Sequence, residues 1–140
     1  MEVKITIDRG NTALKGAIWD ADGNIICAMR GDDSLPAGEL ARELCAKAGG
    51  AVSAPAVAYC SVVASDRADD LASLRSMCGR LIDLDASTPM PMHIRYRTPG
   101  TLGADRIAAA LGAISLVGTE RPLLVSDIGT AVTYDYVAPG

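Results

Sequence analysis

Residues 7–13 read Ile7-Asp8-Arg9-Gly10-Asn11-Thr12-Ala13, and residues 126–132 read Ser126-Asp127-Ile128-Gly129-Thr130-Ala131-Val132. In both stretches an Asp-x-Gly turn with small polar residues separates two segments rich in apolar and β-branched residues. Each stretch therefore predicts a pair of strands joined by a tight turn. One such turn is a short pattern that often occurs by chance. Two copies, each closing a predicted strand, indicate an internal repeat and a candidate functional feature.

The chemistry of this turn suits phosphate binding, although a turn that only joins two strands is the simpler alternative. Glycine has no Cβ, so backbone N–H groups around Gly10 can approach a phosphate closely. Short side chains at Asn11, Thr12 and Thr130 add donors. The Asp at the strand end can hold a hydrated Mg²⁺ against the phosphates. Lys15, on the following strand, can offset their negative charge.

Outward from these turns, the sequence predicts strands that alternate with helices. Strands are expected at residues 3–8, 12–19, 25–30, 56–61, 80–84, 123–126 and 131–137. Helices are expected at residues 36–47 with a cap at Ser34, from Ser65 or Asp66 to about Cys78, and at residues 102–117. Residues 87–100 contain three prolines and are predicted to be extended, with 94–96 a candidate for strand pairing. A meander followed by alternating helices and strands predicts an α/β layered sheet.

Composition narrows the function classes. The chain has 140 residues, 49% hydrophobic and 21% charged, with a net charge of -4. This is globular composition with enough apolar material for a core, and an acidic protein with 4% aromatic residues lacks the basic and stacking surface of a nucleic-acid binder. No apolar run reaches the length of a membrane span. Four cysteines without a C-x-x-C pair are expected to be buried free thiols in a reducing cytoplasm.

A second candidate site lies at Leu102-Gly103-Ala104-Asp105-Arg106. A carboxylate at a helix start favours the helix dipole, which is the structural interpretation of Asp105. Its functional interpretation is a general base that accepts the proton of a hydroxyl attacking the γ-phosphoryl group of ATP. Arg106 can then bind a substrate carboxylate through two parallel hydrogen bonds. Tyr96, upstream, either hydrogen-bonds substrate or packs.

Three motifs, taken in chain order, closely resemble the N-terminal half of the type III pantothenate kinases. They are Asp8-x-Gly10-Asn11-Thr12, the segment from Tyr96 to Arg106 that includes Pro99, and Asp127-Ile128-Gly129-Thr130-Ala131. The repeated turn also resembles the wider superfamily of acetate and sugar kinases, actin and heat-shock chaperone ATPases. That resemblance implies a ribonuclease H-like, actin-type ATPase fold with a mixed sheet. It further implies ATP-dependent phosphorylation of pantothenate to 4'-phosphopantothenate, the first step of coenzyme A biosynthesis.

The resemblance also implies roles for individual residues. ATP phosphates would be bound by the turn, comprising Asp8, Arg9, Gly10, Asn11, Thr12, Ala13, Leu14 and Lys15, and by Thr130. Mg²⁺ would be held by Asp8 through water, and a monovalent cation, K⁺ or NH₄⁺, by Asp127. Pantothenate would be bound by Tyr96, Gly103, Ala104, Asp105 and Arg106, with Arg106 taking its carboxylate and Asp105 acting as the base. Family members usually have an aliphatic residue between Asp and Gly, and this chain has Arg9. The arginine is expected either to be a change at the surface or to contact a phosphate.

The resemblance extends to partners and to domain organisation. Members of this family are cytoplasmic homodimers about twice as long as this chain, so we expect residues 1–118 to form one ribonuclease H-like domain and residues 119–140 to begin a second, truncated one. The 140 residues alone are expected to bind ATP poorly and to be inactive. Neither nucleic acid nor membrane is an expected partner. The alternatives are a non-catalytic accessory transcriptional regulator of the same family, another superfamily small-molecule kinase or phosphatase, and a stand-alone interaction domain.

Overall fold

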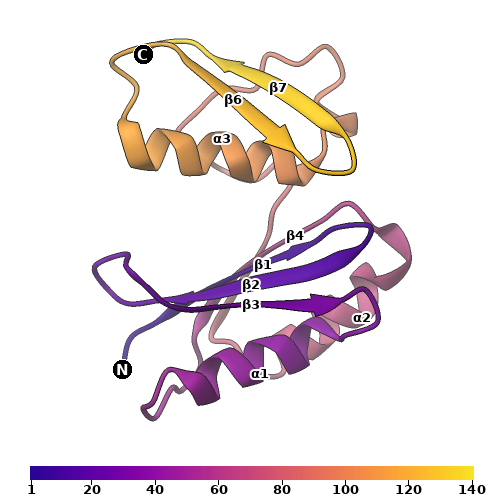
Figure 1. The fold of residues 1–140 in the computed structure, drawn as a ribbon, viewed down its shortest axis with the longest axis vertical. Coiled ribbons are helices and arrows are strands. Elements are labelled where there is room, and N and C mark those ends of the chain that lie inside the picture. Colours follow the sequence, from indigo (N-terminus) through magenta and orange to yellow (C-terminus); the bar gives the residue numbers. More distant parts are fainter. The chain divides into compact units, whose positions relative to one another are not determined.

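The computed structural model describes residues 1–140 and contains two compact units, Met1–Leu84 and Asp85–Gly140 (Figure 1). The predicted boundary at residue 118 differs from this division. Helix α3 (Ala104–Val117) contacts strands β6 (Leu123–Ile128) and β7 (Val132–Val137), so it groups with the strands that follow it. The assignment of residues 1–118 and 119–140 to two domains stays a prediction about the whole protein.

The first unit is a five-stranded mixed sheet with two helices on one face (Figure 1). Its strand order is β3-β2-β1-β4-β5, with an antiparallel meander of β1, β2 and β3 and with β4 and β5 parallel to β1. The elements in chain order are β1 (Lys4–Arg9), β2 (Ala13–Trp19), β3 (Ile25–Asp32), α1 (Ala37–Lys47), β4 (Ala56–Ser61), α2 (Ala64–Arg75) and β5 (Arg80–Asp83). The predicted α/β layered sheet is confirmed.

Alternation along β1 decides which face is covered. Ile5 and Ile7 are buried while Lys4 and Thr6 are exposed, because successive side chains of a strand point to opposite faces. The buried set packs against Leu40 of α1 and other apolar residues in one cluster: Val3, Ile5, Ile7, Leu14, Ile18, Ala37, Leu40, Ala41, Leu44, Val57, Tyr59 and Leu74. The second face of β1, which carries Asp8, points away from this core.

The start of α1 corrects the predicted cap at Ser34. The helix begins at Ala37 after Pro36 and has no cap from its own flanking side chains. Its first N–H groups are instead bound from α2: Asp70 Oδ1 accepts from Ala37 N at 3.0 Å, and Ser73 Oγ accepts from Gly38 N at 3.1 Å. Ser34 binds the carboxylate of Asp32 instead.

The predicted cap of α2 is also wrong. The helix begins at Ala64, one residue before Ser65, with Val63 in the capping position and no side-chain cap. Ser61 supplies the local turn instead, since its hydroxyl accepts from Val63 N at 3.0 Å and donates to Val63 O at 2.9 Å. Free cysteines are found at all four positions, but only Cys60 is buried, and Cys27, Cys45 and Cys78 are half-buried.

The second unit consists of a short 3₁₀ turn η1 (Pro99–Thr101), helix α3 and the β6–β7 hairpin. Residues 94–96 form no strand, so that predicted pairing is wrong. Helix α3 begins at Ala104 rather than residue 102, because the Pro99 turn precedes it. Ala104, Ile107 and Ala110 are its buried residues, at helical spacing.

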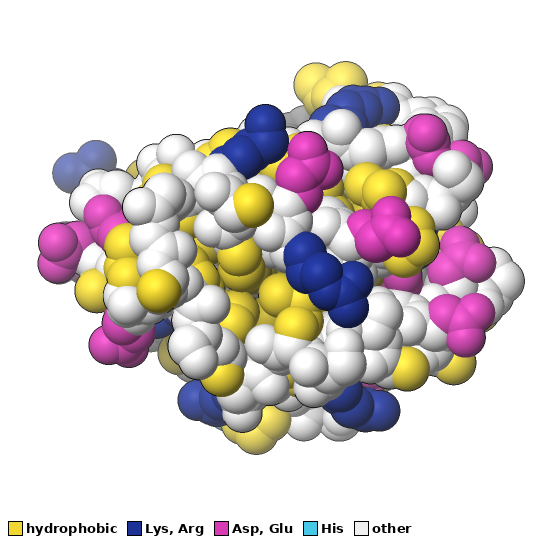
Figure 2. Space-filling view, turned by 90° about the horizontal axis from the view of Figure 1, so that it is seen from below, with side chains coloured by type: hydrophobic (Ala, Val, Ile, Leu, Met, Phe, Trp, Pro, Cys, Tyr) yellow, Lys and Arg dark blue, Asp and Glu magenta, His cyan; other side chains and the backbone are white.

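Surface features agree with the modest, mixed charge of the sequence. Figure 2 shows acidic and basic side chains interspersed with apolar ones on the face seen from below. No helix has the length and apolar character required to cross a membrane.

Candidate functional site

The two Asp-x-Gly turns have the predicted context in the structure. The first lies between β1 and β2, where Gly10 N donates to Ala13 O at 2.9 Å, and the second lies between β6 and β7, where Gly129 N donates to Ala131 O at 3.0 Å. Each Asp occupies the end of the incoming strand. Asn11, Thr12 and Thr130 are exposed, so their short polar side chains are accessible to a ligand.

Asp8 lies in a row of polar side chains that crosses the first sheet. It pairs with Lys15 on β2 and with Cys60 on β4. Residues directly opposite each other on an antiparallel pair project from the same face, so Asp8 and Lys15 are neighbours. The Cys60 thiol donates to Asp8 Oδ1 at 3.3 Å, which orients the carboxylate from the other side. Asp8 and Lys15 are therefore brought together as predicted, and Cys60 is an addition that the sequence analysis treated only as a buried thiol.

Arg9 occupies a different place from the rest of the turn. Its side chain is 2% exposed and points into the α1–α2 side of the sheet. Nε and Nη2 bind both carboxylate oxygens of Asp70, with Nη2–Oδ1 at 3.0 Å, while Nη1 donates to Asp33 O and Nη2 to Leu35 O. The sequence analysis offered two roles for this side chain, a surface change or a phosphate contact. The structure contains neither, because the guanidinium is buried and its hydrogen bonds go to protein groups. Only its backbone belongs to the turn.

Asp70 is a functional residue of this region that no sequence motif indicated. Its side chain is buried and also accepts from the Tyr59 hydroxyl at 2.7 Å. Burial raises the pKa of Tyr59 to about 12, and the hydrogen bond to Asp70 acts in the same direction. Burial alone would lower the pKa of Arg9, but the hydrogen bond and charge of Asp70 outweigh it and raise that pKa.

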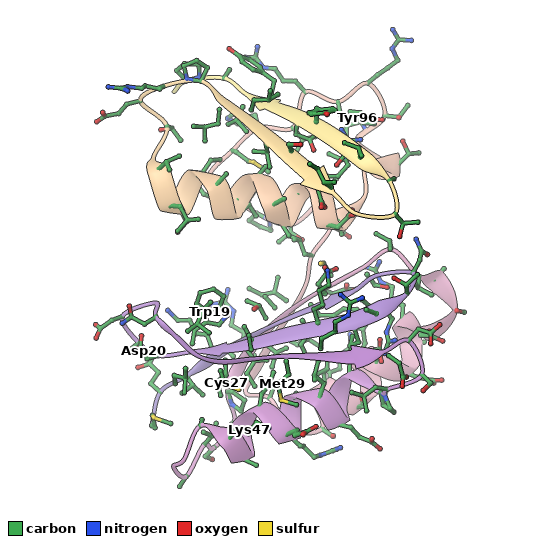
Figure 3. The ribbon with its side chains drawn as sticks, viewed as in Figure 1. Trp19, Asp20, Cys27, Met29, Lys47 and Tyr96 are labelled. Atoms are coloured by element: carbon green, nitrogen blue, oxygen red, sulfur yellow. The ribbon has the colours of Figure 1, made fainter.

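In the second unit, Tyr96 and Arg106 come together as the sequence analysis expected. The Arg106 guanidinium carbon lies 5.6 Å from the centroid of the Tyr96 ring, a cation–π contact. Tyr96, which Figure 3 labels, is 43% exposed and precedes η1. Arg106 is on the first turn of α3 beside Asp105. This places the three predicted substrate side chains around one helix start.

Asp135 on β7 is a further member of this cluster that no sequence signal indicated. Its carboxylate binds Arg106 Nε at 3.0 Å and Nη2 at 2.6 Å, and Tyr134 O accepts a longer bond from Nη2. The hydrogen bond to Asp135 raises the pKa of Arg106. The pair fixes the plane of the guanidinium and leaves Nη1 outside these bonds.

Asp105 has a carboxylate that does not cap its own helix. The residue before α3 is Gly103, and no side-chain cap bond is made there. Asp105 is half-buried, and Ala104 beside it is buried. Asp105 lies in the first turn of α3, which is the position that the helix-dipole interpretation requires, and its role as a base stays a prediction. Gly103 and Ala104 have no functional side chain, so any contact they make with substrate uses the backbone.

The cation-binding predictions rest on single carboxylates. Asp127 is exposed at the end of β6, opposite Thr133, whose hydroxyl oxygen is buried without a partner. No group of three or more His, Cys, Asp or Glu side chains is arranged around one metal position. A carboxylate such as Asp8 still fits Mg²⁺, because this ion is usually held by one or two carboxylates together with phosphates and water.

One solved structure shares the fold of this chain. A crystal structure described as that of a 2-dehydro-3-deoxygalactonokinase protein from Sinorhizobium meliloti superposes with a TM-score of 0.55 at 15% identity, over 96% of this chain and 49% of that one. At this identity the likeness concerns the fold alone. The predicted ribonuclease H-like, actin-type ATPase fold is confirmed.

Sequence comparison then gives the family. A family model described as type III pantothenate kinase matches residues 4–140. Type III pantothenate kinases from Chlorobaculum parvum and Porphyromonas gingivalis are 33% and 34% identical, over 95% and 99% of this chain and 50% and 52% of their own lengths. The chain belongs to the type III pantothenate kinase family, and it spans about half the length of the curated relatives it matches.

Proposed function

We propose that these residues are part of an ATP-dependent kinase that phosphorylates pantothenate to 4'-phosphopantothenate, which would make it the enzyme of the first step of coenzyme A biosynthesis. Family membership supports a kinase. The observation that carries the choice of acceptor is the cluster of Tyr96, Asp105 and Arg106 at the start of α3. A carboxylate base beside an arginine suits an acceptor with both a hydroxyl and a carboxylate, and pantothenate has both.

In this proposal the Asp105 carboxylate accepts the proton of the pantothenate hydroxyl. The hydroxyl oxygen forms a bond to the γ-phosphorus of ATP, the bond from that phosphorus to the β–γ bridging oxygen breaks, and ADP leaves. Arg106 binds the pantothenate carboxylate through the part of its guanidinium that Asp135 leaves available, and Tyr96 packs against its face.

On the nucleotide side, the turn from Asp8 to Lys15 and Thr130 hold the phosphates. The N–H groups of Gly10 and Gly129 close their own turns, so the donors are other backbone N–H groups of the two turns together with the side chains of Asn11, Thr12 and Thr130. Mg²⁺, when bound, neutralises developing charge on the phosphates, and Asp8 would hold it through water. Asp127 would hold K⁺ or NH₄⁺. A cytoplasmic homodimer is part of the same proposal.

Product identification tests the proposal. The full-length protein is incubated with Mg-ATP and either pantothenate or 2-dehydro-3-deoxygalactonate, and the products are analysed by mass spectrometry. We expect a singly phosphorylated pantothenate and ADP in equal amounts, with no phosphorylated sugar acid. Phosphorylation of the sugar acid alone would assign the protein to another small-molecule kinase activity. If the protein phosphorylates neither compound, the proposal that pantothenate is the acceptor is wrong.

A further inference from the structure

A second cation continues the row of Asp8 and Lys15 toward the edge of the first sheet. Arg30 on β3 lies directly opposite Lys15 on β2 in the antiparallel register. Both side chains are exposed, and both project from the face that carries Asp8, away from the α1–α2 core. The order across three strands is therefore Arg30, Lys15, Asp8.

This placement is unfavourable for the protein alone. Like charges directly opposite each other on an antiparallel pair destabilise the sheet. Lys15 lies between Asp8 and Arg30, whereas Arg30 is on the edge strand β3 and has only Lys15 directly opposite it. The nearest acid along β3 on the same face is Asp32, whose carboxylate is bound by the amide and hydroxyl of Ser34. Two cations thus lie directly opposite each other on this face, with the carboxylate of Asp8 beside Lys15 and that of Asp32 two residues along β3 from Arg30.

The dimensions of the row suit a chain of phosphates. Neighbouring strands are about 4.8 Å apart, so β1 to β3 spans about 10 Å, and Gly10 lies about 7 Å along β1 from Asp8. An arginine side chain can cover much of that distance, and its planar fork binds phosphate through two hydrogen bonds. A single phosphate would reach one of the cations, whereas consecutive phosphates can contact both and the glycine turn.

We propose that Arg30 is a further phosphate-binding residue, which joins Lys15 in binding the polyphosphate chain of a nucleoside triphosphate. The inference rests on the proposed function, in which the neighbouring turn binds ATP. It adds a contact from β3, a strand that the Asp-x-Gly turn does not include. It also explains why two cations are kept opposite each other on an exposed face.

The test is calorimetric titration of the full-length protein with inorganic tripolyphosphate and Mg²⁺, which requires no phosphoryl transfer. Arg30→Gln should weaken binding about tenfold, the loss of one charge-assisted hydrogen bond. Arg42→Gln, on the exposed surface of α1, is the matched control and should bind as the wild type does. In steady-state kinetics Arg30→Gln should raise the KM for Mg-ATP by a similar factor and leave the KM for pantothenate unchanged.

Several results would overturn the inference. They are wild-type tripolyphosphate affinity in Arg30→Gln, an equal loss in Arg42→Gln, and no binding by the wild type. If Arg30→Gln does not fold, Arg30→Lys keeps the charge without the planar fork, and undiminished affinity there would count against the proposed contact. Normal binding by Arg30→Gln in an active pantothenate kinase would refute only this inference. Arg30-dependent binding in a protein that does not phosphorylate pantothenate would refute only the proposed function.

Discussion

The two compact units each contain an arginine held by both oxygens of an aspartate, yet the two pairs differ in their surroundings. The side chains of Arg9 and Asp70 are 2% and 4% exposed, whereas those of Arg106 and Asp135 are 24% and 22% exposed. The first pair also binds backbone groups of the β3–α1 connection and the start of α1. The second pair instead carries an exposed aromatic ring on its guanidinium. Accessibility therefore separates a pair that is enclosed in the fold from a pair that a ligand can reach.

The largest expected effect is on catalysis in the second unit. Asp105→Asn keeps the size of the side chain but removes the proton acceptor, and loss of a general base lowers rates by about 10²–10⁴-fold. In the full-length protein we expect kcat to fall by that factor, while the affinity for Mg-ATP measured by calorimetry is retained. Asp69→Asn, an exposed carboxamide substitution on α2, should leave kcat unchanged. A near-normal kcat in Asp105→Asn would show that this carboxylate is not the base.

The buried Arg9–Asp70 pair should make a large contribution to the free energy of unfolding. Asp70→Asn leaves the Arg9 guanidinium buried without its counter-charge, and breaking a buried ion pair costs about 3–5 kcal/mol. Chemical denaturation should show a loss in the free energy of unfolding of about 3 kcal/mol. The comparison of the two pairs fails if the loss is below about 1 kcal/mol, the value typical of an exposed pair.

Asp135→Asn is the matched change in the second unit and should act on substrate rather than stability. The pair is partly exposed, so its removal should cost less than about 1 kcal/mol in the free energy of unfolding. Without Asp135 the Arg106 guanidinium is no longer held in one plane, and we expect the KM for pantothenate to rise about fivefold with the KM for Mg-ATP unchanged. A loss of stability as large as that of Asp70→Asn would remove the distinction between the pairs.

The smallest expected effect is alkaline titration of the buried network. The pKa of Tyr59 is raised to about 12, above the ordinary value of 10.0. The folded state therefore holds the proton more tightly, so this contribution to stability is complete below pH 10 and is lost as the pH rises toward about 12. Phenolate absorbance should show one of the four tyrosines titrating last, and Tyr59→Phe should remove that step. Four tyrosines titrating together in the folded protein would contradict the network.

Local patterns predicted the strands well and the residues that cap the helices poorly, for a physical reason. Strand β4 has the predicted bounds, and β1 and β2 agree to within one residue, because alternation of buried and exposed residues is written in adjacent positions. The first N–H groups of α1 are bound by Asp70 and Ser73, 33 and 35 residues further along the chain. A serine in the expected position at Ser34 was therefore a misleading local signal.

In the candidate site, too, local features were predictable from the sequence and contacts between distant residues were not. The two Asp-x-Gly turns and the neighbourhood of Tyr96 with Arg106 were predictable, because they depend on short motifs and on family resemblance. The burial of Arg9 and the positions of Asp70 and Asp135 were not, because each depends on a partner far away in the sequence. Arg9 and Asp70 are 61 residues apart, and no spacing rule connects them.

The most direct test of the central claim is whether ADP release by the full-length protein depends on pantothenate. ADP is measured in a coupled assay with Mg-ATP and K⁺, in the presence and absence of pantothenate. If the acceptor is bound by Tyr96 and Arg106 beside the base Asp105, ADP should form only when pantothenate is present, one molecule for each pantothenate phosphorylated. ADP release that is the same with and without pantothenate would contradict the assignment of the α3 cluster as the pantothenate site.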